Sequence, residues 1–234
     1  SLIEYSPGTG WIPLVDEYIS GQPTTCICNF PTTATALYQF NDNVNDTCGN
    51  YNGTAFNLNS YVTGKFGKAA DFNGSSSFIA LPDDSTISQQ NNFSLSFWVK
   101  PNGFVTYGTV ICLYSDYRNI VEIRTSGIIG FNTTGSWVDS PSSSITDGVW
   151  QHIAITKSSS AGTVIYVNGS SVITDASDTG NASDFTASSY PNYLGAYVTG
   201  PAYYFPGSLD QMRIFSSVLT QSQVTELYNE IVCT

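Results

Sequence analysis

The sequence predicts an all-β protein whose strands form a two-sheet antiparallel sandwich. The stretch 147–175 holds three runs rich in β-branched and aromatic residues, separated by turn residues as in an antiparallel meander. The pair Asn168-Gly169 between two of these runs is typical of a two-residue hairpin turn, which needs positive φ at both central positions. Both faces of the runs carry apolar side chains, which indicates strands inside a packed sandwich.

Alternation and turn residues place the other elements in order along the chain. The first strand is expected at 36–40, and strands at 69–72 and 78–81 are expected to form a hairpin across the turn 73–77. Residues 93–99 alternate between apolar and polar side chains, and further strands are expected at 109–114, 119–124, 127–132, 193–197, 203–205 and 209–215. Only the tail is expected to be helical, because Thr220 and Gln223 fit a capping box before about 221–229.

Several stretches together resemble a known family. They are GKFGKAADFNG (64–74), FSLSFWVKP (93–101), DGVWQHIAIT (147–156), TVIYVNG (163–169), YLGA (193–196) and FPGSLDQMRIF (205–215). In this order and spacing they resemble the laminin-G-like branch of the concanavalin A-like jelly rolls, over about residues 34 to 230. The resemblance implies a jelly-roll sandwich with one short C-terminal helix. It divides the chain into an extended N-terminal arm, residues 1–33, and a laminin-G-like jelly-roll domain, residues 34–234.

Composition limits the environment and the partners of this chain of 234 residues. Charged residues make up only 11%, against the ~25% usual in globular proteins, which favours an extracellular or cell-surface location. The net charge of −11 argues against nucleic acid and anionic membranes, since both bind basic patches. Because no run of ~18 apolar residues occurs, we expect no membrane insertion.

The arm carries more apolar surface than a disordered linker would. Its large side chains include Ile3, Trp11, Ile12, Leu14, Val15 and Ile19. Pro7, Pro13 and Pro23 prevent the arm from forming a hairpin of its own. We therefore expect these side chains to pack either on their own sandwich or on another copy of the chain. Contact with another copy would be head-to-tail, and such contacts build rings or filaments.

The five cysteines predict two disulfides and one thiol. Cys112 lies in the middle of an apolar strand and is expected to be the buried thiol. The disulfide cysteines are then Cys26, Cys28, Cys48 and Cys233. Cys26 and Cys28 are too close in sequence to pair comfortably with each other. The resemblance implies that the first and last strands lie side by side, so Cys233 is expected to pair with Cys26 or Cys28.

Seven Asn-X-Ser/Thr sequons are candidate N-glycosylation sites: Asn45, Asn52, Asn73, Asn92, Asn132, Asn168 and Asn181. The alternative is that a chain so rich in Asn, Ser and Thr contains several of them by chance.

Catalysis is not expected. Glycosidases need two carboxylates that flank the scissile bond, and the Glu-x-Asp-x-x-Glu strand of the family's glycosidases is absent. His152 is the single histidine and would have to be the base of any catalytic triad. The resemblance assigns it a structural role beside Trp150 instead.

Two candidate binding sites remain. Asp42, Asn43, Asp46 and Asp210 carry the hard oxygen ligands that calcium prefers, and the resemblance implies one Ca²⁺ at a loop edge; the alternative is that they only form turns. The tyrosines Tyr193, Tyr197, Tyr203 and Tyr204 suit a glycan-binding site, although tyrosine is equally common in half-buried strands.

Three classes of function follow. The sequence favours a non-enzymatic extracellular structural or adhesive subunit that assembles with copies of itself through the arm, for example into a filament. The alternative is a lectin-like carbohydrate-binding module that uses calcium or the tyrosines. An enzyme ranks last, and the fold alone decides none of these.

Overall fold

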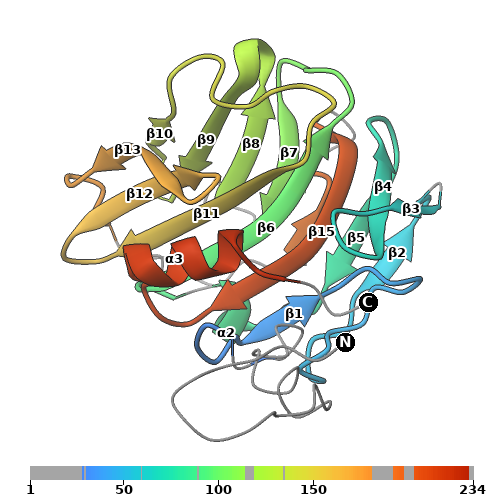
Figure 1. Cartoon of the computed structure of the whole chain (residues 1–234), viewed down its shortest axis with the longest axis horizontal. Helices are drawn as coiled ribbons and strands as arrows, with labels where there is room; N and C mark the ends of the chain where they lie inside the picture. The colour runs from blue at the N-terminus through green and yellow to red at the C-terminus, as the bar shows by residue number, and fades with distance from the viewer. Residues whose placement is uncertain are drawn as a thin grey trace, which may run out of the picture.

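The computed structural model describes residues 28, 30–58, 60–88, 90–113, 119–133, 135–180, 192–197 and 203–231. Within these residues the chain forms two antiparallel sheets that pack face to face, as predicted (Figure 1). The N-terminal arm, apart from Cys28 and residues 30–33, lies outside the described residues. Neither helix in the described part of the chain has the length and apolar character needed to cross a bilayer.

The larger sheet is built from strands taken from the whole length of the chain. They are β1 (Ala36–Tyr38), β3 (Tyr61–Thr63), β4 (Lys68–Asn73), β6 (Phe93–Pro101), β11 (Gln151–Ser158), β12 (Gly162–Val167), β13 (Ser170–Asp175) and β15 (Pro206–Phe215). Their order is β13-β12-β11-β6-β15-β4-β3, and β1 pairs with β15 as well. The long strands β6 and β15 therefore occupy the centre.

The smaller sheet forms the other layer. It contains β2 (Thr54–Phe56), β5 (Phe78–Leu81), β7 (Gly108–Cys112), β8 (Ile120–Arg124), β9 (Ile128–Asn132), β10 (Trp137–Asp139) and β14 (Asn192–Leu194). Their order is β10-β9-β8-β7-β14-β5-β2. A 3₁₀ turn at Thr125–Gly127 connects β8 to β9.

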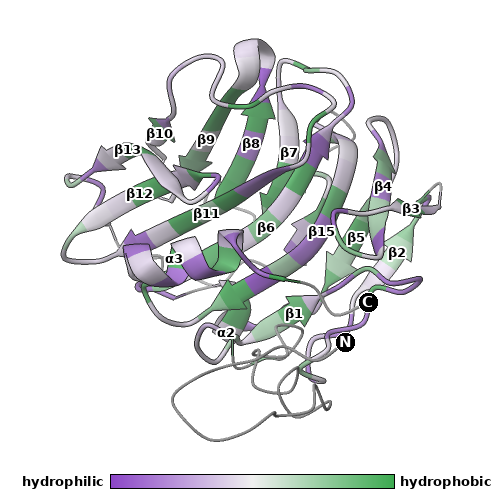
Figure 2. Ribbon diagram, viewed as in Figure 1, coloured by the Kyte–Doolittle hydropathy of each residue, from purple (hydrophilic) through white to green (hydrophobic). Residues whose placement is uncertain are grey.

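The core lies between the two sheets and follows the predicted alternation. Phe93, Leu95, Phe97 and Val99 of β6 all point into it, together with the isoleucines of β11. Figure 2 shows hydrophobic and hydrophilic residues alternating along several strands of both sheets. The Asn168-Gly169 turn joins β12 to β13, and both of its residues have positive φ, as the hairpin prediction requires.

Helix α3 (Gln221–Tyr228) covers part of the outer face of the larger sheet (Figure 1). Its start confirms the predicted capping box, because Thr220 Oγ1 accepts from Gln223 N and the Gln223 side chain accepts from Thr220 N. Val224 and Leu227 point down into a second apolar cluster that contains Ala154 of β11. Both faces of β11 are therefore buried.

Three local predictions were wrong. The strand expected at 203–205 is reduced to an isolated bridge between Tyr204 and Thr109. The turn 73–77 does not close a hairpin, because β4 pairs in the larger sheet and β5 pairs in the smaller one. Asn73 Oδ1 accepts from the backbone N–H groups of Ser75, Ser76 and Ser77, so the turn is closed by a side chain and needs no strand pairing. A second short helix, α2 (Ser85–Ser88), lies between β5 and β6, where no helix was expected.

Candidate functional site

The outer face of the smaller sheet carries a cluster of charged and aromatic side chains. In β8, Val121 and Ile123 point into the core, so Glu122 and Arg124 point to the opposite, outer face. In β10, Val138 is the core residue, and Trp137 and Asp139 likewise point outwards. We call Glu122, Arg124, Trp137 and Asp139 the outer-face cluster.

Strand register brings this cluster together. Glu122 of β8 is paired with Gly130 of β9, and Gly130 is paired with Asp139 of β10. A side chain at Gly130 would overlap both the Arg124 guanidinium and the Asp139 carboxylate. The glycine therefore leaves the space through which Arg124 reaches across β9.

Arg124 is the centre of the cluster. Its Nη2 forms an ion pair with Asp139 Oδ1, and its Nε lies 3.8 Å from Glu122 Oε2. The guanidinium carbon lies 4.6 Å from the centre of the Trp137 ring, in cation–π contact. The Trp137 side chain remains 36% exposed, so the arginine holds an aromatic surface in place while that surface still meets solvent.

Glu122 is unusual because it is only 5% exposed although it faces outwards. Burial raises its pKa to about 7; Arg124 opposes the shift, the negative charge of Asp139 adds to it, and the Thr109 hydroxyl opposes it weakly. Neither Arg124 nor Thr109 makes a hydrogen bond of normal geometry with Glu122 Oε2, which has no hydrogen-bond partner among the described residues. A buried polar atom without a partner is uncommon and suits a ligand that supplies one.

The predicted tyrosines lie on the same face. Tyr193 of β14 is the cross-strand neighbour of Cys112, and Tyr197 packs on Cys112 and Ile120. The Tyr203 ring makes edge contacts with Tyr197 at 5.7 Å and with Tyr107 at 5.1 Å between ring centres. The backbone of Tyr204 bridges to Thr109. Tyr197 is 6% exposed and Tyr107 is 47% exposed, so Tyr107, which was not predicted, offers the more accessible ring.

The sequence contained a signal for the outer-face cluster. Glu122 and Arg124 are separated by one residue on a strand, and so are Trp137 and Asp139, in a chain with few charges. Period-two spacing places each pair on one face of its strand. Nothing in the sequence indicated that the two pairs meet, because their contact depends on the register of β8, β9 and β10.

The residues predicted as calcium ligands have protein partners. The buried Asp46 carboxylate accepts hydrogen bonds from four backbone N–H groups, those of Leu37, Cys48, Asn50 and Tyr51. Asp42 pairs with Lys68 Nζ at 2.7 Å, and Asn43 Oδ1 accepts from Asn45 N. A calcium ion bound by Asp46 would have to displace these bonds.

Asp210 lies on β15, where its Oδ2 accepts from Phe66 N at 2.8 Å and anchors the turn between β3 and β4. Burial raises its pKa to about 7, against the effect of the backbone N–H groups of Phe66, Gln211 and Lys65. In the described part of the chain, no group of three or more His, Cys, Asp or Glu side chains is arranged to hold a metal. Calcium binding therefore stays a prediction.

Cys28 and Cys48 form a disulfide that joins the segment before β1 to the loop after it. Cys28 is thereby excluded as the partner of Cys233, which leaves Cys26 of the two predicted alternatives. Both Cys26 and Cys233 lie outside the described residues. Cys112 is a buried thiol in β7, as predicted.

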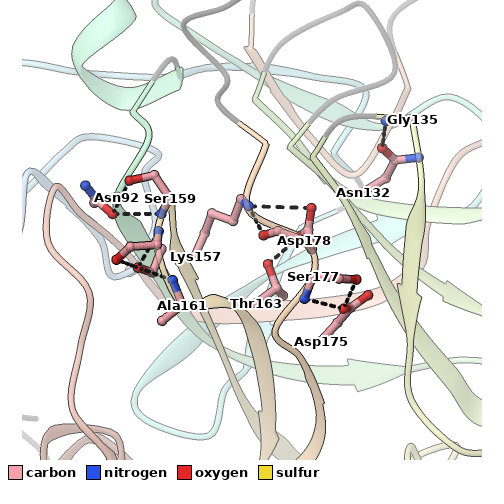
Figure 3. Close-up of polar contacts among 12 residues, drawn as sticks. Asn92, Asn132, Gly135, Lys157, Ser159, Ala161, Thr163, Asp175, Ser177 and Asp178 are labelled. Carbon is pink, nitrogen blue, oxygen red and sulfur yellow. Dashed lines mark hydrogen bonds and ion pairs between the residues drawn. The ribbon is translucent and has the colours of Figure 1, made fainter.

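The sequons differ in their surroundings. Asn45, Asn52 and Asn92 are exposed, and Asn181 lies outside the described residues. Asn92 Oδ1 accepts from Ser159 N, whereas Asn132 is 3% exposed and accepts from Gly135 N (Figure 3).

Two buried titratable side chains, Lys157 and His152, contact other groups of the protein. Lys157 is fully buried at one end of the sandwich, where its Nζ contacts the backbone oxygen and the carboxylate of Asp178 (Figure 3). His152 lies within hydrogen-bonding distance of Ser96 Oγ through Nε2, at 2.9 Å. Burial, with a smaller effect of Arg213, lowers the His152 pKa to about 3, so the imidazole is neutral.

Comparison with known proteins agrees with this architecture. A family model described as the Concanavalin A-like lectin/glucanases superfamily matches residues 73–225. The chain is also similar to the Sushi, von Willebrand factor type A, EGF and pentraxin domain-containing protein 1 of Rattus norvegicus, at 26% identity over 190 residues. That match covers 74% of this chain but only 5% of the rat protein.

Two solved structures illustrate the structural likeness. Domain 4 of AbnA, a GH43 extracellular arabinanase from Geobacillus stearothermophilus solved in complex with arabinotriose, is 29% identical with a TM-score of 0.68. The likeness covers 83% of this chain and 98% of that domain. The binding domain of Paraclostridial Mosquitocidal Protein 1 is 19% identical with a TM-score of 0.63, over 83% of this chain and 51% of that one, which shows the fold alone.

The family match confirms the resemblance inferred from the sequence motifs. It covers well over half of the chain, and it includes β8 and β10, which carry the outer-face cluster. Together with the two-sheet antiparallel sandwich, it shows that the chain belongs to the concanavalin A-like lectin/glucanases superfamily.

Proposed function

We propose that this chain is a non-catalytic, extracellular carbohydrate-binding module that contacts its ligand with the outer face of the smaller sheet. The observation that carries the proposal is the outer-face cluster. Arg124 holds the half-exposed Trp137 ring in place, beside the buried Glu122 Oε2 that lacks a hydrogen-bond partner in the described residues. An aromatic ring packs on the C–H surface of a sugar, and a carboxylate accepts from its hydroxyls.

The similarity to the arabinanase domain supports the proposal, since that domain was solved with an oligosaccharide. Arabinotriose is therefore the first probe, followed by a panel of neutral oligosaccharides. We expect titration to show binding, and Trp137→Ala to weaken it at least ~5-fold, because truncating a central aromatic contact costs more than ~1 kcal/mol. Phe56→Ala is the matched control, since Phe56 is an exposed aromatic residue of the same sheet at its opposite edge. Equal losses in both variants, or no binding across the panel, would reject the site.

Hydrolysis is the competing activity, because a carboxyl group with a pKa near 7 suits a general acid. We propose binding without hydrolysis, since Asp139, the second carboxylate of the outer-face cluster, is ion-paired with the Arg124 guanidinium and is not available as nucleophile or base. Prolonged incubation with arabinotriose should leave it intact by mass spectrometry. Cleavage that Glu122→Gln abolishes would establish an enzyme instead.

Self-assembly through the N-terminal arm is the second candidate. The arm carries unusually many apolar side chains, and β2, at one edge of the smaller sheet, has three exposed residues. An open sheet edge accepts an added strand through backbone hydrogen bonds. Such assembly is compatible with sugar binding, because β2 and β10 lie at opposite edges of the sheet.

A further inference from the structure

A polar groove lies on the other side of the molecule, between the β12–β13 turn and helix α3. Its volume is about 550 Å³. The turn contributes Asn168, Ser170 and Ser171, and the helix contributes Gln221, Thr225 and Tyr228. Amides, hydroxyls and one aromatic ring are the groups that contact carbohydrate.

Asn168 is held in this groove in one orientation. Its backbone N–H donates to His152 O at 2.8 Å, and its Oδ1 accepts from His152 N at 2.9 Å. Since a backbone N–H needs an acceptor, these bonds assign the oxygen and the nitrogen of the side-chain amide. Among the described residues, no group accepts a hydrogen bond from Asn168 Nδ2.

We propose that Asn168, in the sequon Asn168-Gly169-Ser170, carries an N-linked glycan whose first sugars lie in this groove against Tyr228. The glycan is attached through Nδ2, the amide atom that the fold leaves unused. Attachment removes only one of the two N–H bonds of that nitrogen, and Oδ1 keeps its hydrogen bond to His152.

The other described sequons do not combine an unused Nδ2 with an adjacent groove. Asn132 is almost completely buried, and Asn73 Nδ2 donates to Ser76 Oγ at 3.0 Å. Asn45, Asn52 and Asn92 occupy exposed positions outside the regular strands, from which a glycan would extend into solvent.

The Tyr228 ring is suited to receive a sugar. It stacks on Trp98 with ring centres 5.9 Å apart and an interplanar angle of 28°, which fixes its orientation, yet the residue is 37% exposed. The β12–β13 turn lies close to this ring, since a Cβ on Gly169 would lie 3.1–3.4 Å from Tyr228 atoms. A glycan on Asn168 would therefore bridge the turn and the helix and protect α3 from local opening.

The test uses the full-length chain secreted from a host with N-glycosylation. Glycopeptide mapping should find Asn168 occupied, and enzymatic release from the native protein should be slower there than at Asn45. Ser170→Ala removes the sequon but keeps both bonds between Asn168 and His152. It should increase hydrogen exchange in residues 221–228.

Thr47→Ala is the matched control, because it removes the Asn45 sequon by replacing another exposed hydroxyl residue. It should leave exchange in α3 unchanged, and Ser170→Ala should have no effect on protein made without glycosylation. An unmodified Asn168, or equal exchange in the glycosylated parent and Ser170→Ala, would overturn the proposal. Soluble oligosaccharide bound in the groove of a protein with unmodified Asn168 would also overturn it.

Discussion

Arg213 of β15 and Glu230, two residues beyond helix α3, form a buried two-point ion pair. The Nη1–Oε2 and Nη2–Oε1 distances are 2.9 and 2.6 Å, and the side chains are only 1% and 2% exposed. The pair joins the residues just after α3 to the centre of the larger sheet, so the helix is part of the folded unit.

Removing one partner of this pair should strongly destabilise the protein. Glu230→Ala leaves a buried guanidinium without its carboxylate, and we expect a loss of ~3–5 kcal/mol in the free energy of unfolding. Chemical denaturation would measure it. The double variant Arg213→Met with Glu230→Leu should recover most of the loss, since apolar replacements of both partners avoid an unpaired charge. Similar stabilities of the single and double variants would contradict this account.

The Asp46 carboxylate should matter far more than that of Asp42. Asp46→Ala deprives four backbone N–H groups of their acceptor, so we expect a loss of ~3 kcal/mol or more. Asp42→Ala is the control; it breaks an exposed ion pair with Lys68 and should cost less than ~1 kcal/mol. Equal losses, measured by denaturation, would show that the hydrogen-bond network around Asp46 is not formed.

Glu122 should make stability depend on pH. Its pKa rises from 4.5 to about 7 on folding, so the folded state binds more protons between these values. Its contribution to the free energy of unfolding is fully present below pH 4.5 and is lost as the pH rises to about 7. Asp210 acts in the same direction, whereas the lowered pKa of His152 acts in the opposite one.

The effect of Glu122 is isolated by comparing the free energy of unfolding of the parent with that of Glu122→Gln. The variant should gain stability relative to the parent as pH rises from about 4.5 to 7, with no further gain above that range. Urea denaturation at several pH values measures this difference. A difference independent of pH would mean that Glu122 is ionised normally in the folded protein.

If calcium binds at the predicted ligands, adding it to chelator-treated protein should raise the melting temperature, because a ligand of the native state stabilises that state. Asp210→Ala should abolish this rise, and Asp83→Ala, which alters an exposed carboxylate, should preserve it. An unchanged melting temperature in the parent would leave Asp42, Asn43 and Asp46 with their hydrogen-bonding roles alone.

Deleting residues 1–25 tests assembly through the arm. If the arm joins neighbouring copies, the shortened chain should remain folded and run as a monomer in light scattering, while the full-length chain forms larger species. A full-length chain that stays monomeric at high concentration would show that the arm does not link copies.

Local patterns in the sequence predicted much of the fold. The alternation in Phe93–Val99, the Asn168-Gly169 turn and the Thr220–Gln223 capping box all rest on interactions within a few residues. Such interactions are the same whatever the rest of the chain does, so the sequence alone determined them.

Only the tertiary structure decided which strands became neighbours. The turn at Asn73 satisfies its own hydrogen bonds, so local chemistry allowed both a hairpin and the observed passage between sheets. In the same way, Arg124 meets Asp139 and Trp137 only because β9 places Gly130 between them. Strand register is set by the packing of whole sheets, and therefore the outer-face cluster could not be derived from the spacing of its residues.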